Sequence, residues 1–386
     1  MFDKLVKRNF LKALNKINYG QIVIKTPEGE TIQVNGSHEG YNVYVELYDW
    51  RVIANLIVKG DVGFAADYRD GYFTTDNLYN LICFGLQNEH LFQHYAYGSL
   101  WFKLLSKLLY LTRRNTLKGS RRNIQAHYDL GNDFYKLWLD PSMTYSAAIF
   151  DYEGQDLTEA QHKKYDRILD KIGDKPGSIL EVGCGWGGFA ERAILRKHQV
   201  KGITLSNEQA NYAQMRLKDT NAKIEIEDYR HQTGSYDYIV SIEMLEAVGM
   251  KYWPVYFGKL KQLLKPGGKI LLQTITISDD LFKSYAKQSD MIRTFIFPGG
   301  MLPSEKSLAR ELDKCGLKCC DIFRFGKDYA TTLQIWLKQF KQKLESILRL
   351  GFDEEFARMW EFYLAACSAG FISERINVVQ MEIVHA

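Results

Sequence analysis

Several features that would assign a chain to a membrane, secreted or metal-binding class are missing from this sequence. Its 386 residues contain no apolar run of about 18 or more residues, so no membrane-spanning helix is predicted. The first residues lack the apolar core of a signal peptide, which favours a cytoplasmic protein. The six cysteines show no paired C-x-x-C spacing, so we expect reduced thiols and no metal site.

Acidic residues are also missing from one long stretch. No Asp or Glu lies between Glu89 and Asp129. Within this stretch, residues 99–111 predict a helix dominated by Leu, Trp and Phe, with a narrow polar stripe. The stretch carries seven fixed positive charges, on Lys103, Lys107, Arg113, Arg114, Lys118, Arg121 and Arg122.

A mainly apolar helix beside a basic run is what a segment needs to bind an anionic membrane surface. The same pattern also suits a core helix followed by a solvated linker, and composition does not separate the two interpretations. Nothing in the sequence matches a nucleic-acid-binding module, so we expect no nucleic-acid partner. The remaining composition, with 46% hydrophobic and 25% charged residues, is that of a soluble globular protein.

A glycine-rich segment is the most informative motif. Residues 178–182 predict a buried strand, and Gly183, Gly185 and Gly188 follow it before a helix predicted at 187–197. Glycine lets the backbone turn sharply and approach a ligand closely, and the helix would point its first N–H groups at that ligand. The spacing G-x-G-x-x-G is compatible with a dinucleotide or with another nucleotide-like cofactor.

Two details favour S-adenosylmethionine as that cofactor. A nicotinamide site needs an acidic residue at the end of the second strand, and the strand predicted at 200–204 ends without one. Glu181 instead gives the pattern E-x-G-x-G-x-G, which is usual in S-adenosylmethionine-dependent methyltransferases.

The order of predicted elements indicates an α/β fold. Strands at 178–182, 200–204, 223–226, 237–242 and 269–275 alternate with helices at 187–197, 206–218 and 252–264, as in a doubly wound parallel sheet. The tail predicts a strand at 317–325, two helices between 329 and 372, and a last strand at 377–384. This ending suits the antiparallel edge of a class I methyltransferase, whose Rossmann-like sheet has seven strands.

A smaller α+β domain is predicted before this sheet. It would hold strands at 21–25, 31–34 and 41–47, a helix at 50–59 capped by Asp49, and a helix at 77–86. We therefore expect three parts: an N-terminal, membrane-associated domain at 1–112, a basic linker at 113–124, and a catalytic domain at 125–386.

Polar residues collect where the predicted strands end, which is the edge where ligands bind in such sheets. Glu243 and Glu246 follow the strand at 237–242. A carboxylate there could stabilise positive charge, take a proton or cap the next turn. The residues placed at this edge are Gly183, Gly185, Thr204, Asp228, Tyr229, Glu243, Glu246, Gln273 and Ile275.

Several ordered motifs occur along the second part of the chain. They are His127–Tyr135, Met143–Ser146, Leu180–Gly188, Gly202–Gln209, Ile239–Gly249, Ile296–Pro303, Asp328–Leu333 and Ile376–Gln380. Together they cover about residues 120–386 and resemble the cyclopropane fatty acid synthase family, which includes the mycolic acid cyclopropane synthases. Residues 60–73 resemble the extra domain of members that act on intact phospholipids.

The resemblance implies a reaction in which a methyl group passes from S-adenosylmethionine to a cis double bond of an acyl chain. Proton loss from the cation-like product then closes a cyclopropane ring. Aromatic faces can stabilise such a cation, and the candidates are Tyr135, Trp138, Tyr145, Phe150 and Tyr329. The resemblance places around the cofactor Tyr145, Ser146, Gly183, Gly185, Thr204, Leu205, Gln209, Asp228, Tyr229 and Ile242.

The resemblance also implies a bound bicarbonate as the base, held near a cysteine, a glutamate, a histidine, an isoleucine and a tyrosine. Carried over, three of these are Glu246, Ile275 and Tyr329. This chain departs at the other two, with Ala147 for the cysteine and Gln273 for the histidine. If the contact at 147 is a backbone N–H, alanine keeps it; if the side chains matter, the anion site is weakened.

The sequence therefore predicts a cytoplasmic enzyme, peripheral at the inner membrane face, with anionic phospholipid as substrate. Three alternatives stay open. The same fold could end the reaction in a methyl- or methylene-branched chain, it could methylate a small soluble acceptor, or the chain could bind lipid with an inactive catalytic domain. A homodimer is also left open.

Overall fold

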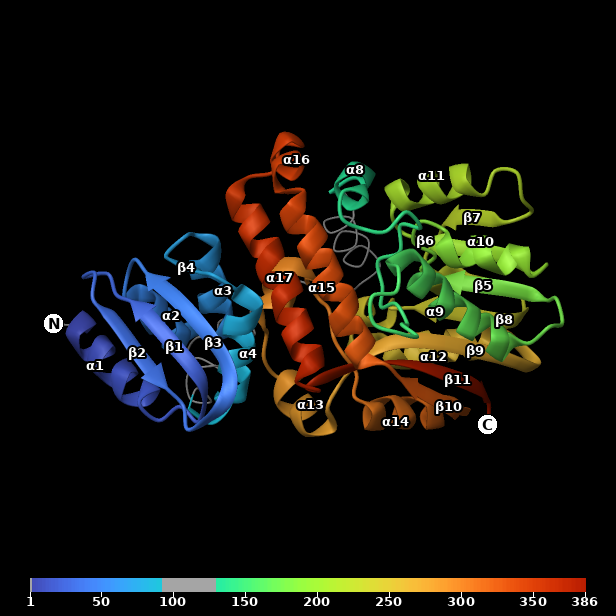
Figure 1. Cartoon of the computed structure of the whole chain (residues 1–386). Coiled ribbons are helices and arrows are strands. Elements are labelled where there is room, and N and C mark those ends of the chain that lie inside the picture. The colour runs from blue at the N-terminus through green and yellow to red at the C-terminus, as the bar shows by residue number, and fades with distance from the viewer. Residues whose placement is uncertain (1, 92–129) are drawn as a thin grey trace. The chain divides into compact units, whose positions relative to one another are not determined.

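The computed structural model of the chain describes residues 2–91 and 130–386 (Figure 1). These residues form two compact units. The first combines the described residues up to 91 with 287–296 and 340–373, and the second combines 130–286, 297–339 and 374–386. The apolar helix predicted at 99–111 and the basic linker at 113–124 lie outside the described residues.

The second unit is built on a seven-stranded sheet with the order β10-β11-β9-β8-β5-β6-β7. The pairs β9–β8, β8–β5, β5–β6 and β6–β7 are parallel, whereas β11 runs antiparallel to both β9 and β10. The antiparallel edge predicted for a class I methyltransferase is therefore present. The strand bounds are β5 Ser178–Val182, β6 Gln199–Thr204, β7 Lys223–Ile226, β8 Tyr236–Ile242, β9 Leu264–Ile277, β10 Leu317–Arg324 and β11 Ile376–His385.

Helices cover both faces of this sheet because its strands are apolar on both sides. Successive strand residues point to opposite faces, so Ile179 packs in one core cluster while Leu180 packs in the other. The cluster around Ile179 includes the apolar faces of α9, α10 and α11, and the cluster around Leu180 includes those of α12 and α14. The helix bounds are α8 Asn132–Lys136, α9 Leu157–Ile172, α10 Gly188–Leu195, α11 Asn207–Arg216, α12 Trp253–Leu263, α13 Asp279–Tyr285, α14 Glu305–Cys315 and α15 Gly326–Gln342.

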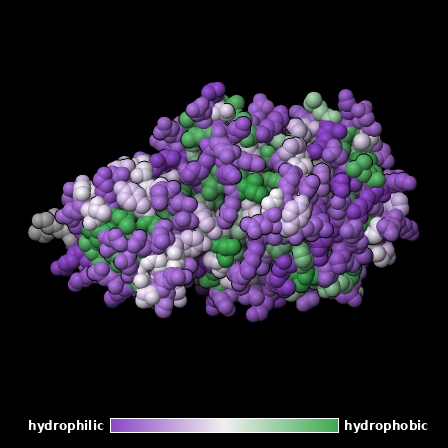
Figure 2. All heavy atoms as spheres, in the orientation of Figure 1, coloured by the Kyte–Doolittle hydropathy of each residue, from purple (hydrophilic) through white to green (hydrophobic). Residues whose placement is uncertain are grey.

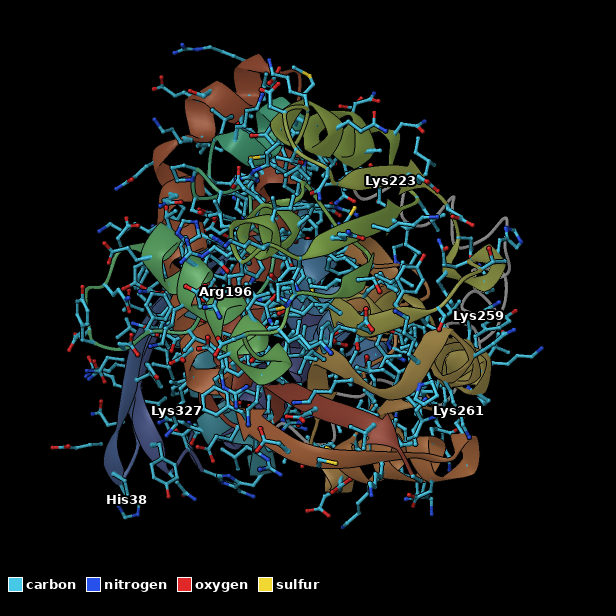
Figure 3. The ribbon with its side chains drawn as sticks, turned by 90° about the vertical axis from the view of Figure 1, so that its right-hand side faces the viewer. His38, Arg196, Lys223, Lys259, Lys261 and Lys327 are labelled. Atoms are coloured by element: carbon cyan, nitrogen blue, oxygen red, sulfur yellow. The ribbon has the colours of Figure 1, made fainter. Side chains whose placement is uncertain are left out.

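Ion pairs hold α10 against α9 at the surface of this layer. The Arg192 guanidinium donates to Asp166 at 3.0 and 2.6 Å. Arg196, at the end of α10 (Figure 3), contacts Asp166 at 3.1 Å and Asp170 at 2.5 Å. Pairs of this kind contribute up to about 1 kcal/mol each, so burial of the apolar helix faces remains the main source of stability.

The first unit contains a four-stranded sheet with the order β2-β1-β3-β4. The helix predicted at 50–59 is present as α2, but Asp49 is not its N-cap; the N-cap is Trp50, which makes no side-chain cap bond. The Asp49 carboxylate still accepts the N–H of Arg51, the first residue of α2, at 2.8 Å. The bounds are β1 Tyr19–Lys25, β2 Thr31–Asn35, β3 His38–Leu47, β4 Phe73–Thr75, α1 Phe2–Leu14, α2 Arg51–Lys59, α3 Asp61–Arg69 and α4 Leu78–Gln87.

Segments from late in the chain complete the first unit. They are the π-helical turn Ile292–Ile296 and the helices α16 (Leu344–Arg349) and α17 (Glu354–Ile372). The Arg358 guanidinium donates to the backbone oxygens of Tyr68 at 2.6 Å and Phe73 at 2.9 Å. The Tyr68 hydroxyl donates to Glu361 at 2.9 Å. These bonds tie α17 to the end of α3 and to β4.

The face shown in Figure 2 is mainly hydrophilic, with small groups of apolar side chains. Among the residues that the structure describes, no helix is both long enough and apolar enough to cross a bilayer.

Candidate active site

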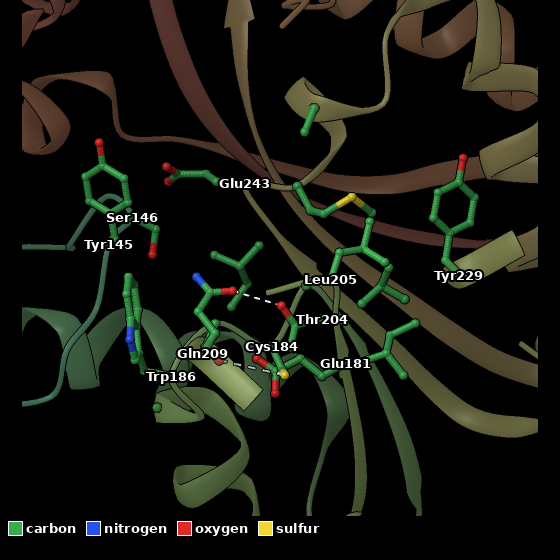
Figure 4. Close-up of a pocket in the computed structure, with 18 of the residues that line it drawn as sticks. Tyr145, Ser146, Glu181, Cys184, Trp186, Thr204, Leu205, Gln209, Tyr229 and Glu243 are labelled. Atoms are coloured by element: carbon green, nitrogen blue, oxygen red, sulfur yellow. Dashed lines mark hydrogen bonds between the residues drawn. The ribbon is translucent and has the colours of Figure 1, made fainter. Parts of the chain in front are cut away.

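A cavity opens at the carboxyl ends of β5, β6 and β8, where a doubly wound sheet binds its ligand (Figure 4). The structure brings to its wall all ten residues that the sequence places around the cofactor. These are Tyr145, Ser146, Gly183, Gly185, Thr204, Leu205, Gln209, Asp228, Tyr229 and Ile242.

The glycine loop forms one side of this cavity. The backbone N–H groups of Gly183 and Cys184 both donate to the Ile203 carbonyl, at 2.9 and 3.0 Å, so the loop is anchored to β6. Gly185 has a φ of 51° and no atom within 4 Å of the position where a Cβ would stand. The backbone there is therefore exposed to whatever fills the cavity, as a close approach to a cofactor requires.

Polar side chains from the ends of β6 and β7 form a second side. The Thr204 hydroxyl donates to the Gln209 amide oxygen at 2.8 Å (Figure 4), and Ser206 caps α11. Asp228 forms two bonds with the Arg230 guanidinium, at 2.8 and 2.6 Å. Burial raises the pKa of Asp228, but the bonds from Arg230 outweigh it and hold that pKa below its usual value.

The lining suits S-adenosylmethionine, a nucleoside with a positively charged sulfur. Among the described residues, the cavity wall carries four carboxylic acids, on Glu181, Glu227, Asp228 and Glu243, and one basic side chain, on Arg230. One carboxyl oxygen of Glu181 is buried with no hydrogen-bond partner among the described residues. Threonine, glutamine and aspartate at the strand ends can bond ribose and amine groups. The residues present therefore fit this cofactor.

Glu243 is the centre of a hydrogen-bond cluster on the cavity wall. Its Oε1 accepts the Ala147 N–H at 2.8 Å and the Gln273 amide at 2.7 Å, and its Oε2 accepts the Tyr329 hydroxyl at 2.8 Å. The backbone at Glu243 has a φ of 50°, a conformation that few residues other than glycine adopt. Burial raises the pKa of Glu243, while these bonds and the charge of Lys164 oppose that shift.

Glu246 lies in a separate group. Its Oε1 accepts the Ile275 N–H at 2.5 Å and the Thr274 hydroxyl at 3.0 Å, and its buried Oε2 has no partner among the described residues. Burial, followed by the charge of Glu243, raises the pKa of Glu246 to about 8. Of the five residues predicted to be catalytic, Ala147, Gln273 and Tyr329 thus meet at Glu243, and Glu246 meets Ile275.

Lys164 is a residue of this region that the sequence analysis does not single out. It lies in α9, is fully buried, and donates to the Ser146 hydroxyl at 2.6 Å. Burial lowers the pKa of Lys164 to about 7, against the charges of Glu243, Asp140 and Glu181. Its position in the sequence does indicate burial, because Lys164 lies on the apolar stripe of the helix, four residues after Ala160 and four before Ile168.

An aromatic cluster packs against Tyr145, a residue of the cavity wall. Tyr145, on the cavity wall, packs with ring centroids 5.5 Å from Tyr135, 5.5 Å from Trp138 and 5.3 Å from Trp336. The Tyr329 ring contacts Trp336 at 6.1 Å. Four of the five aromatic residues proposed to face a cation therefore lie in one cluster.

Comparison with solved structures agrees with this architecture. The mycolic acid cyclopropane synthase CmaA1, solved with SAH and CTAB, is 32% identical and superimposes with a TM-score of 0.64, covering 68% of this chain and 97% of that one. The cyclopropane synthase MmaA2 from Mycobacterium tuberculosis gives a TM-score of 0.64 at 31% identity, with the same coverage. The strand order, the glycine loop and the cavity define a class I S-adenosylmethionine-dependent methyltransferase.

The sequence comparisons narrow that class to one family. Residues 115–381 match the model of the mycolic acid cyclopropane synthetase family, to which the chain belongs. The cyclopropane-fatty-acyl-phospholipid synthase of Escherichia coli is 34% identical over 91% of this chain and 89% of its own. The tuberculostearic acid methyltransferase UfaA1 of Mycobacterium tuberculosis is 41% identical over 69% of this chain and 65% of its own, slightly less than two thirds of that relative.

Proposed function

We propose that the chain transfers a methylene unit from S-adenosylmethionine to the cis double bond of unsaturated acyl chains in membrane phospholipids, giving cyclopropane fatty acids. One observation carries the proposal: a cofactor cavity and a buried carboxylate cluster share a wall formed by Tyr145, Ser146 and Glu243. The match to the Escherichia coli phospholipid enzyme over 91% of the chain supports the same substrate class.

The cavity residues have distinct tasks in this reaction. S-adenosylmethionine supplies the methyl group on a positive sulfur. Gly185 gives it room, while Thr204 and Gln209 offer polar groups at the end of β6. An alkene is a weak nucleophile, so methyl and double bond must be held close together away from water. The aromatic cluster around Tyr145 provides faces that stabilise the cation formed after transfer.

Proton loss is assigned to the hydrogen-bond groups around Glu243 and Glu246. Ala147, Gln273 and Tyr329 would orient the group that takes the proton, and Glu246 with Ile275 would assist from the adjoining strand. Because the pKa of Glu246 is raised to about 8, its carboxyl carries a proton at neutral pH and does not add a second negative charge.

We further propose that the protein works at the surface of an anionic membrane on the cytoplasmic side. The seven basic residues between 103 and 122, next to an apolar segment, support this location. A phospholipid acyl chain lies inside the bilayer, so the enzyme must bind the membrane to reach its substrate. A homodimer is an additional proposal, which sedimentation of the pure protein would test.

A second product has specific support. UfaA1, 41% identical, is named a tuberculostearic acid methyltransferase, and residues 147 and 273 depart from the cyclopropane synthase pattern. A chain with this site could end the reaction in a methyl or methylene branch. Expression in a host without such lipids, followed by mass spectrometry and NMR of its fatty acids, distinguishes the ring from either branch. Unchanged host lipids, despite soluble protein, would contradict both products.

A further inference from the structure

The structure assigns the role of the catalytic base to Glu243, so that the reaction needs no external anion such as bicarbonate. This inference rests on the proposed function and adds the group that accepts the proton. It departs from the resemblance, which implies that a bound bicarbonate is the base and names Glu246 as the glutamate beside it.

The first support is that the donors expected around an anion already serve Glu243. Its carboxylate accepts the Ala147 N–H at 2.8 Å, the Gln273 amide at 2.7 Å and the Tyr329 hydroxyl at 2.8 Å. A backbone N–H and a phenol each have a single proton to donate. The N–H of Ile275 is likewise engaged, by Glu246 at 2.5 Å. The residues present therefore do not fit a bicarbonate, because its place is taken by a carboxylate of the chain.

The second support is that a chain of bonds sets the direction of the Gln273 amide. The Arg167 guanidinium donates to the Gln380 oxygen at 2.8 Å, and the Gln380 amide donates to the Gln273 oxygen at 2.9 Å. Gln273 and Gln380 are register partners on β9 and β11. With its oxygen used in this way, Gln273 presents its N–H₂ to Glu243, which is the orientation that favours an ionised carboxylate.

The third support is the position of Glu243 relative to the ligand and to charge. It lines the cavity together with Tyr145 and Ser146, so its carboxylate can reach a reacting group bound there. Lys164 is buried and bonded to Ser146, and its positive charge opposes the rise that burial causes in the pKa of Glu243. Glu246, protonated at neutral pH, does not compete for that positive charge.

The acyl double bond, the cofactor's methyl group and the Glu243 carboxylate account for every bond that forms or breaks in the reaction. The π electrons of the acyl double bond attack the methyl carbon, and the carbon–sulfur bond breaks with its electrons passing to sulfur. One C–H bond of the transferred methyl then breaks: its proton goes to the Glu243 carboxylate, and its electron pair forms the third C–C bond of the ring. Glu243 afterwards releases the proton to solvent.

Removing the Glu243 carboxylate should make activity depend on an added anion such as bicarbonate, which the wild type does not need. Glu243→Gly deletes the base and leaves space beside Ala147, Gln273 and Tyr329, while glycine tolerates the φ of 50°. We expect its activity on vesicles of unsaturated phosphatidylglycerol to fall at least ~100-fold, as for loss of a general base. Sodium bicarbonate or formate should restore part of the lost activity, in proportion to its concentration. Glu243→Gln fills the space of the original side chain, so added anion should not restore its activity.

The control is Glu374→Gly. Glu374 is also a glutamate with positive φ, at 57°, but its exposed side chain pairs with Lys327 on the surface. This variant should keep full activity and show no response to bicarbonate. Glu374→Gly should bind S-adenosylmethionine as the wild type does in calorimetry, and all variants should give cooperative melting curves, which separates loss of the base from loss of folding.

Binding of bicarbonate gives a readout that does not depend on activity. Carbon-13 bicarbonate should bind Glu243→Gly, seen as line broadening in NMR and as a higher melting temperature, and should not bind the wild type. Wild-type activity that requires bicarbonate, bicarbonate binding to the wild type, or full activity of Glu243→Gly in bicarbonate-free buffer would each overturn the inference. If the wild type consumes no S-adenosylmethionine on any unsaturated lipid, the proposed function fails, and the binding comparison still decides the role of Glu243.

Discussion

Replacing Gly185 by leucine should block cofactor binding without unfolding the protein. The new side chain would meet no protein atom, because nothing lies within 4 Å of the Cβ position, and would instead project into the cavity. Forcing extra carbons into a well-fitted site costs about 1–3 kcal/mol. Since about 1.4 kcal/mol corresponds to a factor of ten, affinity for S-adenosylmethionine should fall about 10- to 100-fold.

The same substitution also carries a backbone cost that must be separated from the loss of binding. A non-glycine residue in the left-handed region costs about 1–2 kcal/mol. For a domain of this size each kcal/mol lowers the melting temperature by about 2–4 °C. Gly154→Leu is the matched control, because Gly154 has a φ of 82°, is exposed, and also has no atom within 4 Å of its Cβ position.

Calorimetric titration with S-adenosylmethionine, beside melting curves of both variants, measures these effects. Both variants should melt at a similar, slightly lower temperature, and only Gly185→Leu should lose affinity. NAD should neither bind nor stabilise the wild type. Unchanged affinity in Gly185→Leu, or an equal loss in Gly154→Leu, would refute the placement of the cofactor against the glycine loop.

Three further outcomes are expected. Replacing Lys103, Arg113 and Arg122 by serine should weaken binding to anionic vesicles roughly a hundredfold, because each charge contributes about 1 kcal/mol. Binding of the wild type should weaken as salt rises, and salt-independent binding in co-sedimentation would contradict this. The pKa of Glu246 is raised to about 8 in the folded chain, whereas in the unfolded chain the carboxyl titrates in the ordinary range. Between those two pH values the folded protein holds a proton that the unfolded chain has released. The contribution of Glu246 to stability therefore falls as pH rises through that window. Glu246→Gln should therefore gain stability relative to the wild type from pH 5 to pH 8 in denaturant titrations, and a constant difference would refute the assignment. Ala147→Cys should leave the product ratio unchanged in lipid mass spectrometry, because residue 147 contacts Glu243 through its backbone N–H; a shift toward cyclopropane would show that the side chain matters.

Much of the catalytic fold can be predicted because its signals are local. The strands at 178–182 and 223–226 have the predicted bounds, since the first is a short, mainly apolar run and the second alternates charged and apolar residues. The glycine loop and the ends of β6 and β7 follow directly from that alternation. Five of the ten residues predicted around the cofactor, Gly183, Gly185, Thr204, Asp228 and Tyr229, are placed at this edge by the topology alone, and the other five are predicted from the resemblance; all ten line one cavity.

The carboxylate cluster could not be predicted in the same way. Glu243 and Glu246 lie three residues apart, and either could face the cavity from the end of β8. The φ of 50° at Glu243 and the pairing of Gln273 with Gln380 across β9 and β11 decide which one receives the donors. Both are properties of the assembled sheet. The packing of α17 in the first unit could not be predicted either, because it depends on contacts of Arg358 with residues nearly 300 positions earlier in the chain.

Methylene transfer to an acyl double bond can be followed atom by atom with labelled cofactor. Purified protein would be incubated with vesicles of a cis-monounsaturated phosphatidylglycerol and S-adenosylmethionine bearing a fully deuterated methyl group. Mass spectrometry and NMR of the released fatty acids should show a cyclopropane whose ring carbon keeps two of the three deuterons. A methyl branch that keeps all three deuterons, or S-adenosylhomocysteine formed while every acyl chain stays unlabelled, would contradict the account.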